Sequence, residues 1–109
     1  MTSETVITYW VKLYLSGPLD VIKQECRKEC LTGLCVTVEP TLFIYTGGEE
    51  TGAVIGLLNY PRFPRTPEEI TSIAAKLALQ LLEATHQHSV LIVTPDFTKW
   101  ITKRCQEEQ

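Results

Sequence analysis

The chain has 109 residues, of which 44% are hydrophobic, and its formal net charge is −3. This suits one domain, 1–109, with a modest core over about 6–102. No apolar run approaches the ~20 residues that span a bilayer, and the N-terminus lacks a signal-like basic region, so we expect a cytoplasmic protein with no membrane partner. Without a lysine or arginine cluster, nucleic acid is not an expected partner either.

The first half of the chain predicts a strand, a helix and a second strand. Residues 6–15 alternate in hydropathy as a strand does. A helix is predicted to open at Pro18, a tolerated first-turn proline, and to end in a left-handed cap at Gly33. Residues 34–46 predict the next strand, in which Pro40 indicates a sheet edge or a bulge.

A glycine turn follows, with two adjacent carboxylates, Glu49 and Glu50, predicted at its tip. Residues 51–60 predict the third strand. Charged residues at a hairpin tip usually face solvent, and this is the simplest interpretation of the pair. Glycines within strands weaken a sheet, however, and tend to mark bulges or the close approach of a ligand. The glycines concerned are Gly47, Gly48, Gly52 and Gly56.

The second half predicts a long helix and one or two further strands. Thr66 and Glu69 form a capping box for a helix over 67–85. Residues 88–94 predict a fourth strand, and 97–102 a possible fifth, before a polar tail. The order β-α-β-β-α-β predicts an α+β, ferredoxin-like sandwich, an antiparallel sheet with two helices on one face. Trp10 and Tyr14 would then lie on the uncovered face, as a partner surface.

Metal and redox chemistry find little support in the sequence. The four cysteines are Cys26, Cys30, Cys35 and Cys105. None of them forms a Cys-x-x-Cys pair, so small buried thiols are expected rather than zinc ligands. His86 and His88 flank a predicted solvated helix end. No metal site and no cofactor are predicted.

Several short segments, in order from Ile7 to Thr102, resemble the phage S-adenosylmethionine (SAM) lyases, formerly called SAM hydrolases. They are the aromatic first strand ITYWVKLYLSG, the segment GLCVTVEPT, a tyrosine followed by a turn that ends in Glu-Glu, and a glutamine before the fourth strand in HQHSVLIV. No one of these is specific, and their shared order is the basis of the resemblance.

The resemblance implies conversion of SAM to 5′-methylthioadenosine and homoserine lactone, a phage counter-restriction activity, by a ferredoxin-like homotrimer with sites between its subunits. It implies Glu50 as the key carboxylate, Tyr45 as the active-site tyrosine and Gln87 as the helix-end glutamine. Glu49 is the alternative to Glu50. The residues expected to line the substrate beside them are Glu39, Thr41 and Phe43.

Such a reaction needs no enzyme nucleophile, because the methionine carboxylate of SAM attacks its own γ-carbon. Holding that folded geometry supplies ~7–11 kcal/mol in good intramolecular cases. Two other functions stay open on the sequence: a non-enzymatic trimeric ligand-binding module, and a phage protein that inhibits a host enzyme through the aromatic sheet face. Whether lactone or homoserine is the direct product also stays open.

Overall fold

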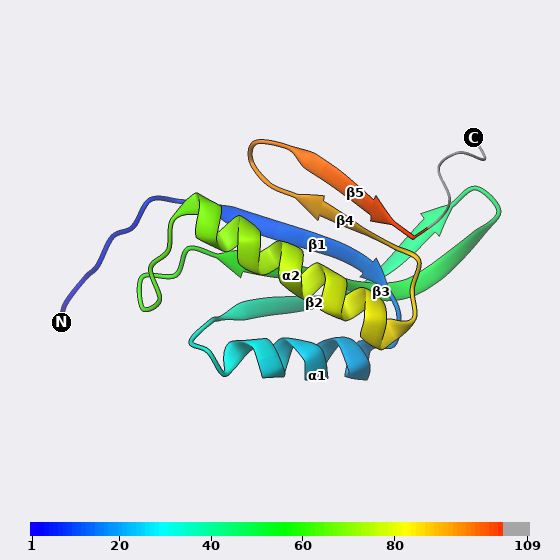
Figure 1. Cartoon of the computed structure of the whole chain (residues 1–109), viewed down its shortest axis with the longest axis horizontal. Coiled ribbons are helices and arrows are strands. Elements are labelled where there is room, and N and C mark those ends of the chain that lie inside the picture. Colours follow the sequence, from blue (N-terminus) through cyan, green and yellow to red (C-terminus); the bar gives the residue numbers. More distant parts are fainter. Residues whose placement is uncertain (104–109) are drawn as a thin grey trace.

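The computed structural model describes residues 1–103 and shows one five-stranded antiparallel sheet with two helices on one face (Figure 1). The strand order is β2-β3-β1-β4-β5, and each neighbouring pair is antiparallel. The elements are β1 (Trp10–Ser16), α1 (Leu19–Cys30), β2 (Val36–Tyr45), β3 (Gly48–Leu58), α2 (Pro67–Thr85), β4 (Ser89–Val93) and β5 (Thr98–Thr102). The predicted α+β fold is confirmed, and the possible last strand is present.

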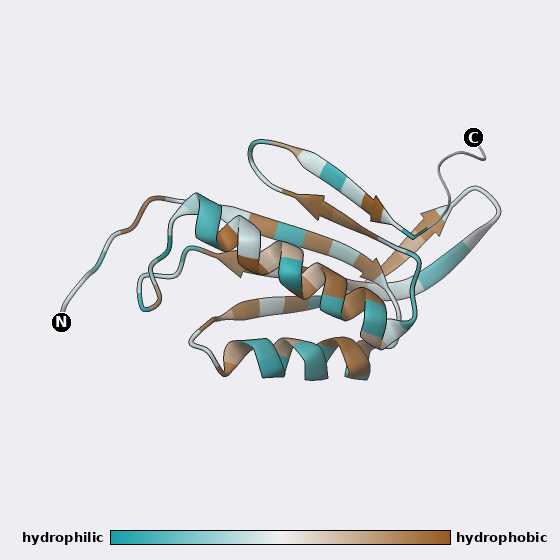
Figure 2. Ribbon diagram, in the orientation of Figure 1, coloured by the Kyte–Doolittle hydropathy of each residue, from teal (hydrophilic) through white to brown (hydrophobic). Residues whose placement is uncertain are grey.

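The core lies between the sheet and the helices. Along β1, hydrophobic and polar residues alternate (Figure 2), and the buried ones point toward the helices. The largest fully buried side chains are Val11, Leu13, Leu15, Ile22, Ile55, Leu57, Leu77, Leu81, Leu82 and Val90. The opposite sheet face carries no helix, and we call it the open face.

The second helix begins where the sequence predicts. The Thr66 side chain accepts a hydrogen bond from the Glu69 backbone N–H at 3.1 Å, and the Glu69 carboxylate accepts one from the Thr66 N–H at 2.8 Å. At the other end, His86 adopts the left-handed conformation with φ of 57°. These caps satisfy backbone groups that the helix leaves unpaired. No helix in residues 1–103 is long and apolar enough to cross a membrane.

Three predicted boundaries were wrong. The first strand starts at Trp10 rather than residue 6, because its partner β3 ends at Leu58, directly opposite Trp10. The first helix ends at Cys30, and Gly33, with φ of 85°, lies in the loop beyond it. The third strand begins at Gly48 rather than residue 51, so the turn before it contains only two residues.

Pro40 marks a sheet edge and not a bulge. It lies in β2, at one end of the strand order, and the pairing with β3 continues through it without a shift in register. The prediction of buried thiols holds for Cys26, and Cys30 is partly buried. Cys35 is exposed, in the loop directly before the edge strand β2. Cys105 falls outside the described residues.

Candidate functional site

The β2–β3 hairpin closes through a two-residue turn, Thr46-Gly47, and this turn decides where the carboxylates point. Gly47 has φ of 93°, a conformation that glycine adopts freely. The resulting register places Glu50 directly opposite Phe43 and Glu49 directly opposite Ile44. Because side chains alternate along a strand, Glu50 and Glu49 project from opposite faces of the hairpin. The sequence had predicted both glutamates at the tip of the turn, whereas the structure places both in β3.

Most of the predicted site residues share the open face. Glu39, Thr41, Phe43 and Tyr45 are alternate residues of β2. Directly opposite residues of an antiparallel pair project to the same side, so Glu50 joins this row beside Phe43. We call these five residues the open-face row. Glu49 is separated from them, on the side where the helices lie.

Tyr45 and Glu50 occupy diagonal positions on the same face at the hairpin end. The Tyr45 ring covers Gly48, since a Cβ built on that glycine would be 3.3 Å from the tyrosine hydroxyl. Tyr45 is 52% exposed, and Glu50 is exposed as well. Within residues 1–103, the Glu50 carboxylate has no hydrogen bond or ion pair. It is therefore available to an incoming group that carries donors or positive charge.

The hairpin extends past the rest of the sheet. Its neighbour β1 ends at Ser16, opposite Gly52, whereas the β2–β3 pairing continues for four more residue pairs, from Leu42 with Thr51 to Tyr45 with Gly48. Figure 1 shows this end of the hairpin beyond the body of the molecule. Apolar side chains are exposed there, including Ile44 at 76%. A protruding apolar hairpin is suited to packing against another chain.

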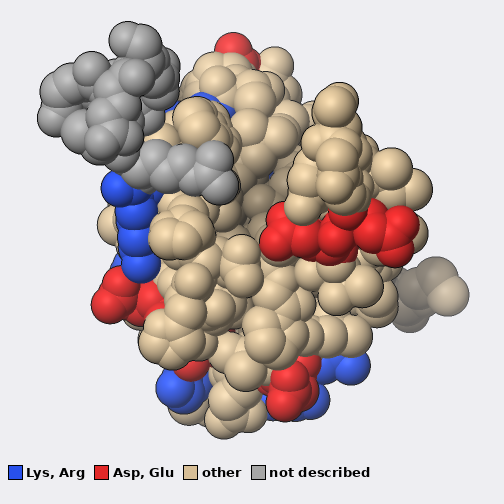
Figure 3. Space-filling view, turned by 90° about the vertical axis from the view of Figure 1, so that its right-hand side faces the viewer, with Lys and Arg blue, Asp and Glu red and all other residues tan. Residues whose placement is uncertain are grey.

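Acidic atoms gather at this end of the molecule. Figure 3 looks onto it and shows a red band on one side of the face, apart from the blue atoms of Lys and Arg. Within residues 1–103, two of the three ion pairs lie on the helices, and the third joins Lys103 to Glu83; Glu49 and Glu50 belong to none of them. The two hairpin carboxylates thus have no paired cation among the described residues, which favours a positively charged ligand beside them.

Gln87 lies at the same end of the sheet. Its backbone N–H donates to the Leu82 carbonyl at 3.3 Å, and its Cγ would be 3.7 Å from a Cβ built on Gly17. Gly17 in turn donates its N–H to the Thr51 carbonyl at 3.0 Å, next to Glu50 in the chain. The structure therefore groups Gln87 with the start of β3, although no side-chain contact joins it to the open-face row.

The chain itself explains the glycines that the sequence interpretation associated with a ligand. A Cβ on Gly52 would meet the Leu15 carbonyl oxygen and lie 2.6 Å from the Ser16 Cα. A Cβ on Gly56 would meet the Thr37 hydroxyl. Gly52 needs glycine because the β1 backbone approaches it closely, whereas the neighbour of Gly56 is a side chain; both contacts are made within the chain and give no support to a bound ligand.

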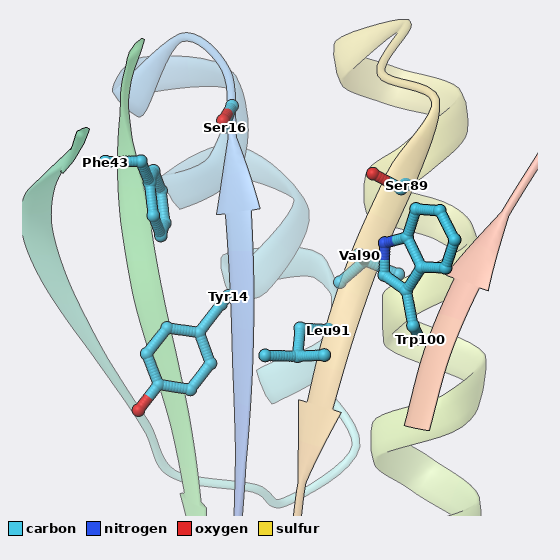
Figure 4. A pocket seen from close by; sticks show the side chains of 7 residues that line it. All are labelled: Tyr14, Ser16, Phe43, Ser89, Val90, Leu91 and Trp100. Carbon is cyan, nitrogen blue, oxygen red and sulfur yellow. The ribbon is translucent and has the colours of Figure 1, made fainter. Parts of the chain in front are cut away.

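A hollow of about 410 Å³ opens on the open face beside the row. Its lining residues come from four strands and are Tyr14, Ser16, Phe43, Ser89, Val90, Leu91 and Trp100 (Figure 4). The pairing places Tyr14 opposite Leu91 and Leu91 opposite Trp100, so these three form one row across the sheet. Trp100 is not among the site residues predicted from the sequence. The alternation in TKWIT, matched to that of SVLIV, would have placed it on this face.

The described thiols, Cys26, Cys30 and Cys35, are not part of a metal-binding group. Within residues 1–103, no three His, Cys, Asp or Glu side chains are arranged to hold a metal ion. Burial raises the pKa of Cys26 to about 11, with smaller contributions from neighbouring Cys30 and Glu25, and burial also raises the pKa of Cys30. Both groups are therefore protonated at neutral pH and poor nucleophiles.

The structure thus defines an α+β sandwich with an open sheet face, an aromatic hollow and a carboxylate, Glu50, that has no partner among residues 1–103. No family model and no curated protein matches the sequence. A phage SAM lyase in its apo state has a similar structure, with a TM-score of 0.65, 17% sequence identity and coverage of 89% of this chain and 90% of that chain. A phage SAM lyase in complex with S-methyl-5′-thioadenosine gives a TM-score of 0.67 and 14% identity, covering 94% of this chain and 96% of that one. These likenesses confirm the resemblance inferred from the sequence at the level of the fold.

Proposed function

We propose that this protein is a SAM lyase that converts SAM to 5′-methylthioadenosine and homoserine lactone. The observation that carries the proposal is the position of Glu50, an exposed carboxylate with no partner among residues 1–103, directly opposite Phe43 and diagonal to Tyr45 on one face of the hairpin. Carboxylate and aromatic faces both attract a cation, and the sulfonium of SAM is one. The shared fold of phage SAM lyases supports the same substrate.

The proposed reaction balances within the substrate. A carboxylate oxygen of the methionine moiety attacks the γ-carbon and forms a C–O bond. The bond between that carbon and sulfur breaks, and its electron pair stays on sulfur. The products are the lactone and 5′-methylthioadenosine, with no proton, water, metal or oxidant consumed. The enzyme supplies geometry, which is the effect most valuable in intramolecular reactions.

Three side chains have assigned roles in this proposal. Glu50 accepts hydrogen bonds from the ribose hydroxyls or balances the sulfonium charge. Tyr45 positions the substrate through its ring or its hydroxyl, and Gln87 hydrogen-bonds the amino-acid end of the substrate. Glu39, Thr41 and Phe43 line the remainder of the ligand along β2. The row is open to solvent in one chain, and Glu50 and Tyr45 are both exposed.

We therefore place the complete site between subunits of a homotrimer. The attacking carboxylate and the sulfonium lose charge during the reaction, so a site shielded from water favours the step. A single chain does not provide that shield at the hairpin, because four of its residue pairs extend past β1. A neighbouring subunit packed on the exposed apolar residues of the hairpin would provide it. Phage origin, counter-restriction and a cytoplasmic location belong to the same proposal.

The test is to incubate the purified protein with SAM, without added metal, and to follow 5′-methylthioadenosine by chromatography. Early samples are assayed for lactone, because lactone hydrolyses to homoserine with time. Product above the spontaneous background is expected, with lactone preceding homoserine. SAM that binds but stays intact would instead identify a ligand-binding module. If the folded protein neither binds nor degrades SAM, the remaining hypothesis is that it inhibits a host enzyme.

A further inference from the structure

We propose that the hollow between Phe43 and Trp100 binds the adenine ring of the substrate. This inference rests on the proposed function and adds to it the place of the nucleobase, with Trp100 as a binding residue. Phe43 is the one lining residue of the hollow that also belongs to the open-face row.

The shape of the hollow suits a flat ligand. Tyr14 and Leu91 project from the adjacent central strands β1 and β4, while Phe43 and Trp100 lie toward the two sides (Figure 4). The Trp100 indole lies over β4, with its ring nitrogen toward the middle of the hollow. The volume of about 410 Å³ is within the range of roughly 300–1,000 Å³ that small-molecule pockets occupy.

The chemistry of the lining selects a neutral aromatic heterocycle. Three of the seven lining side chains are aromatic, three carry hydroxyls (Tyr14, Ser16 and Ser89) and none is charged. Among the described residues, a phosphate or carboxylate would find no cation in the lining, and Lys12, the lysine of β1, lies 5.6 Å from the Trp10 ring centroid in a cation–π contact. Adenine stacks on aromatic rings and hydrogen-bonds with hydroxyls such as those of Ser16 and Ser89.

The position of Phe43 links the two parts of the ligand. One side of Phe43 belongs to the hollow, and the residue directly opposite it across the hairpin is Glu50. An adenine ring beside Phe43 therefore places the attached ribose and sulfur toward Glu50. This is the order of groups in SAM, in which adenine, ribose and sulfonium follow one another.

The experiment uses the two tryptophans of the chain, Trp10 and Trp100. In the variant Trp10→Phe, Trp100 is the only tryptophan left and is excited selectively, at a wavelength where the four tyrosines do not absorb, while every lining residue of the hollow is kept. Titration with 5′-methylthioadenosine is expected to change the Trp100 emission with a saturable curve, and methionine alone is expected to leave it unchanged. Emission that responds to protein concentration and not to the nucleoside would overturn the proposal, because a second copy would then occupy the hollow.

A matched pair of variants gives a second readout. Trp100→Ala is expected to weaken 5′-methylthioadenosine binding about 10-fold or more, in line with the loss of one stacking partner. Trp10→Ala serves as the control, since Trp10 lies on the same face but opposite Leu58 and outside the hollow. If Trp100→Ala alters assembly, the fluorescence titration decides alone.

Failure of the inference is separable from failure of the proposed function. If SAM is degraded while Trp100 is insensitive to the nucleoside and Trp100→Ala leaves KM unchanged, the adenine site is wrong and the lyase stands. If the nucleoside changes the Trp100 emission while SAM stays intact, the site stands and the lyase is wrong.

Discussion

Glu50 on β3 lies directly opposite Phe43 on β2, and both side chains project from the sheet face that no helix covers. Pairs of this kind in an antiparallel sheet have Cβ atoms about 5 Å apart, so the carboxylate and the ring are neighbours. The relationship depends on the two-residue turn at Thr46-Gly47, because one residue more or fewer would reverse the face of each glutamate.

The two adjacent glutamates provide a matched test of the site. We expect Glu50→Gln to reduce SAM turnover by about 100-fold, a loss comparable to removing one preorganised electrostatic group. Glu49→Gln removes the same charge from the opposite face and is expected to retain nearly full turnover. Both residues are exposed, so circular dichroism should show unchanged folding. Equal losses in the two variants would contradict the assignment of Glu50.

Gly52 is expected to be a strict requirement of the fold. Gly52→Ala brings a Cβ against the Leu15–Ser16 backbone, and backbone cannot rotate away. We expect a loss of about 3 kcal/mol in the free energy of unfolding, at the upper end for overpacking. Gly56→Ala is the control, because its Cβ meets the rotatable Thr37 side chain. Urea unfolding measures both, and Gly52→Ala should be the less stable variant.

The raised pKa of Cys26 predicts a loss of stability at alkaline pH. Below about pH 9 the thiol is protonated in both folded and unfolded chains and contributes no pH dependence. Between pH 9 and the folded pKa of about 11, the unfolded chain releases this proton more readily, so rising pH favours unfolding. The effect is of the order of 2 kcal/mol across that interval.

The measurement is the free energy of unfolding as a function of pH in the parent chain and in Cys26→Ala. The variant lowers stability at every pH because it shortens a buried side chain. Its decline between pH 9 and 11 should nevertheless be shallower than that of the parent chain. Parallel curves would show that Cys26 does not cause the decline.

The exposed hairpin predicts an effect on assembly. Ile44 is 76% exposed on the extended part of the hairpin, so Ile44→Lys has little to disrupt within one chain. We expect the variant to fold but to form fewer trimers, measured by light scattering at several protein concentrations. SAM turnover should fall in proportion to the decrease in the trimeric fraction. A variant that is fully trimeric would exclude Ile44 from the interface.

The elements whose signals lie within short segments could be predicted from sequence. The capping box at Thr66 depends on residues three apart, and the edge position of Pro40 depends on its missing N–H. The start of β1 could not be predicted, because it is set by where the distant β3 ends, at Leu58.

The candidate site was less accessible to sequence reasoning for the same reason. The stretch Thr46 to Glu50 contains two glycines, and sequence alone does not fix which of them occupies the left-handed turn position. That choice sets the register and therefore the faces of Glu49 and Glu50. The hollow required still more, since it combines Phe43 with Trp100, from strands at opposite sides of the sheet.

Pro40 also limits the ways in which copies of this protein can join. A free sheet edge with a regular row of N–H and C=O groups invites strand-by-strand addition, which leads to open-ended aggregates. The proline removes one donor from the middle of β2, and the strand at the other edge, β5, has only five residues. Both edges are thereby poor templates, which directs association toward the hairpin and favours assemblies that close after a few copies.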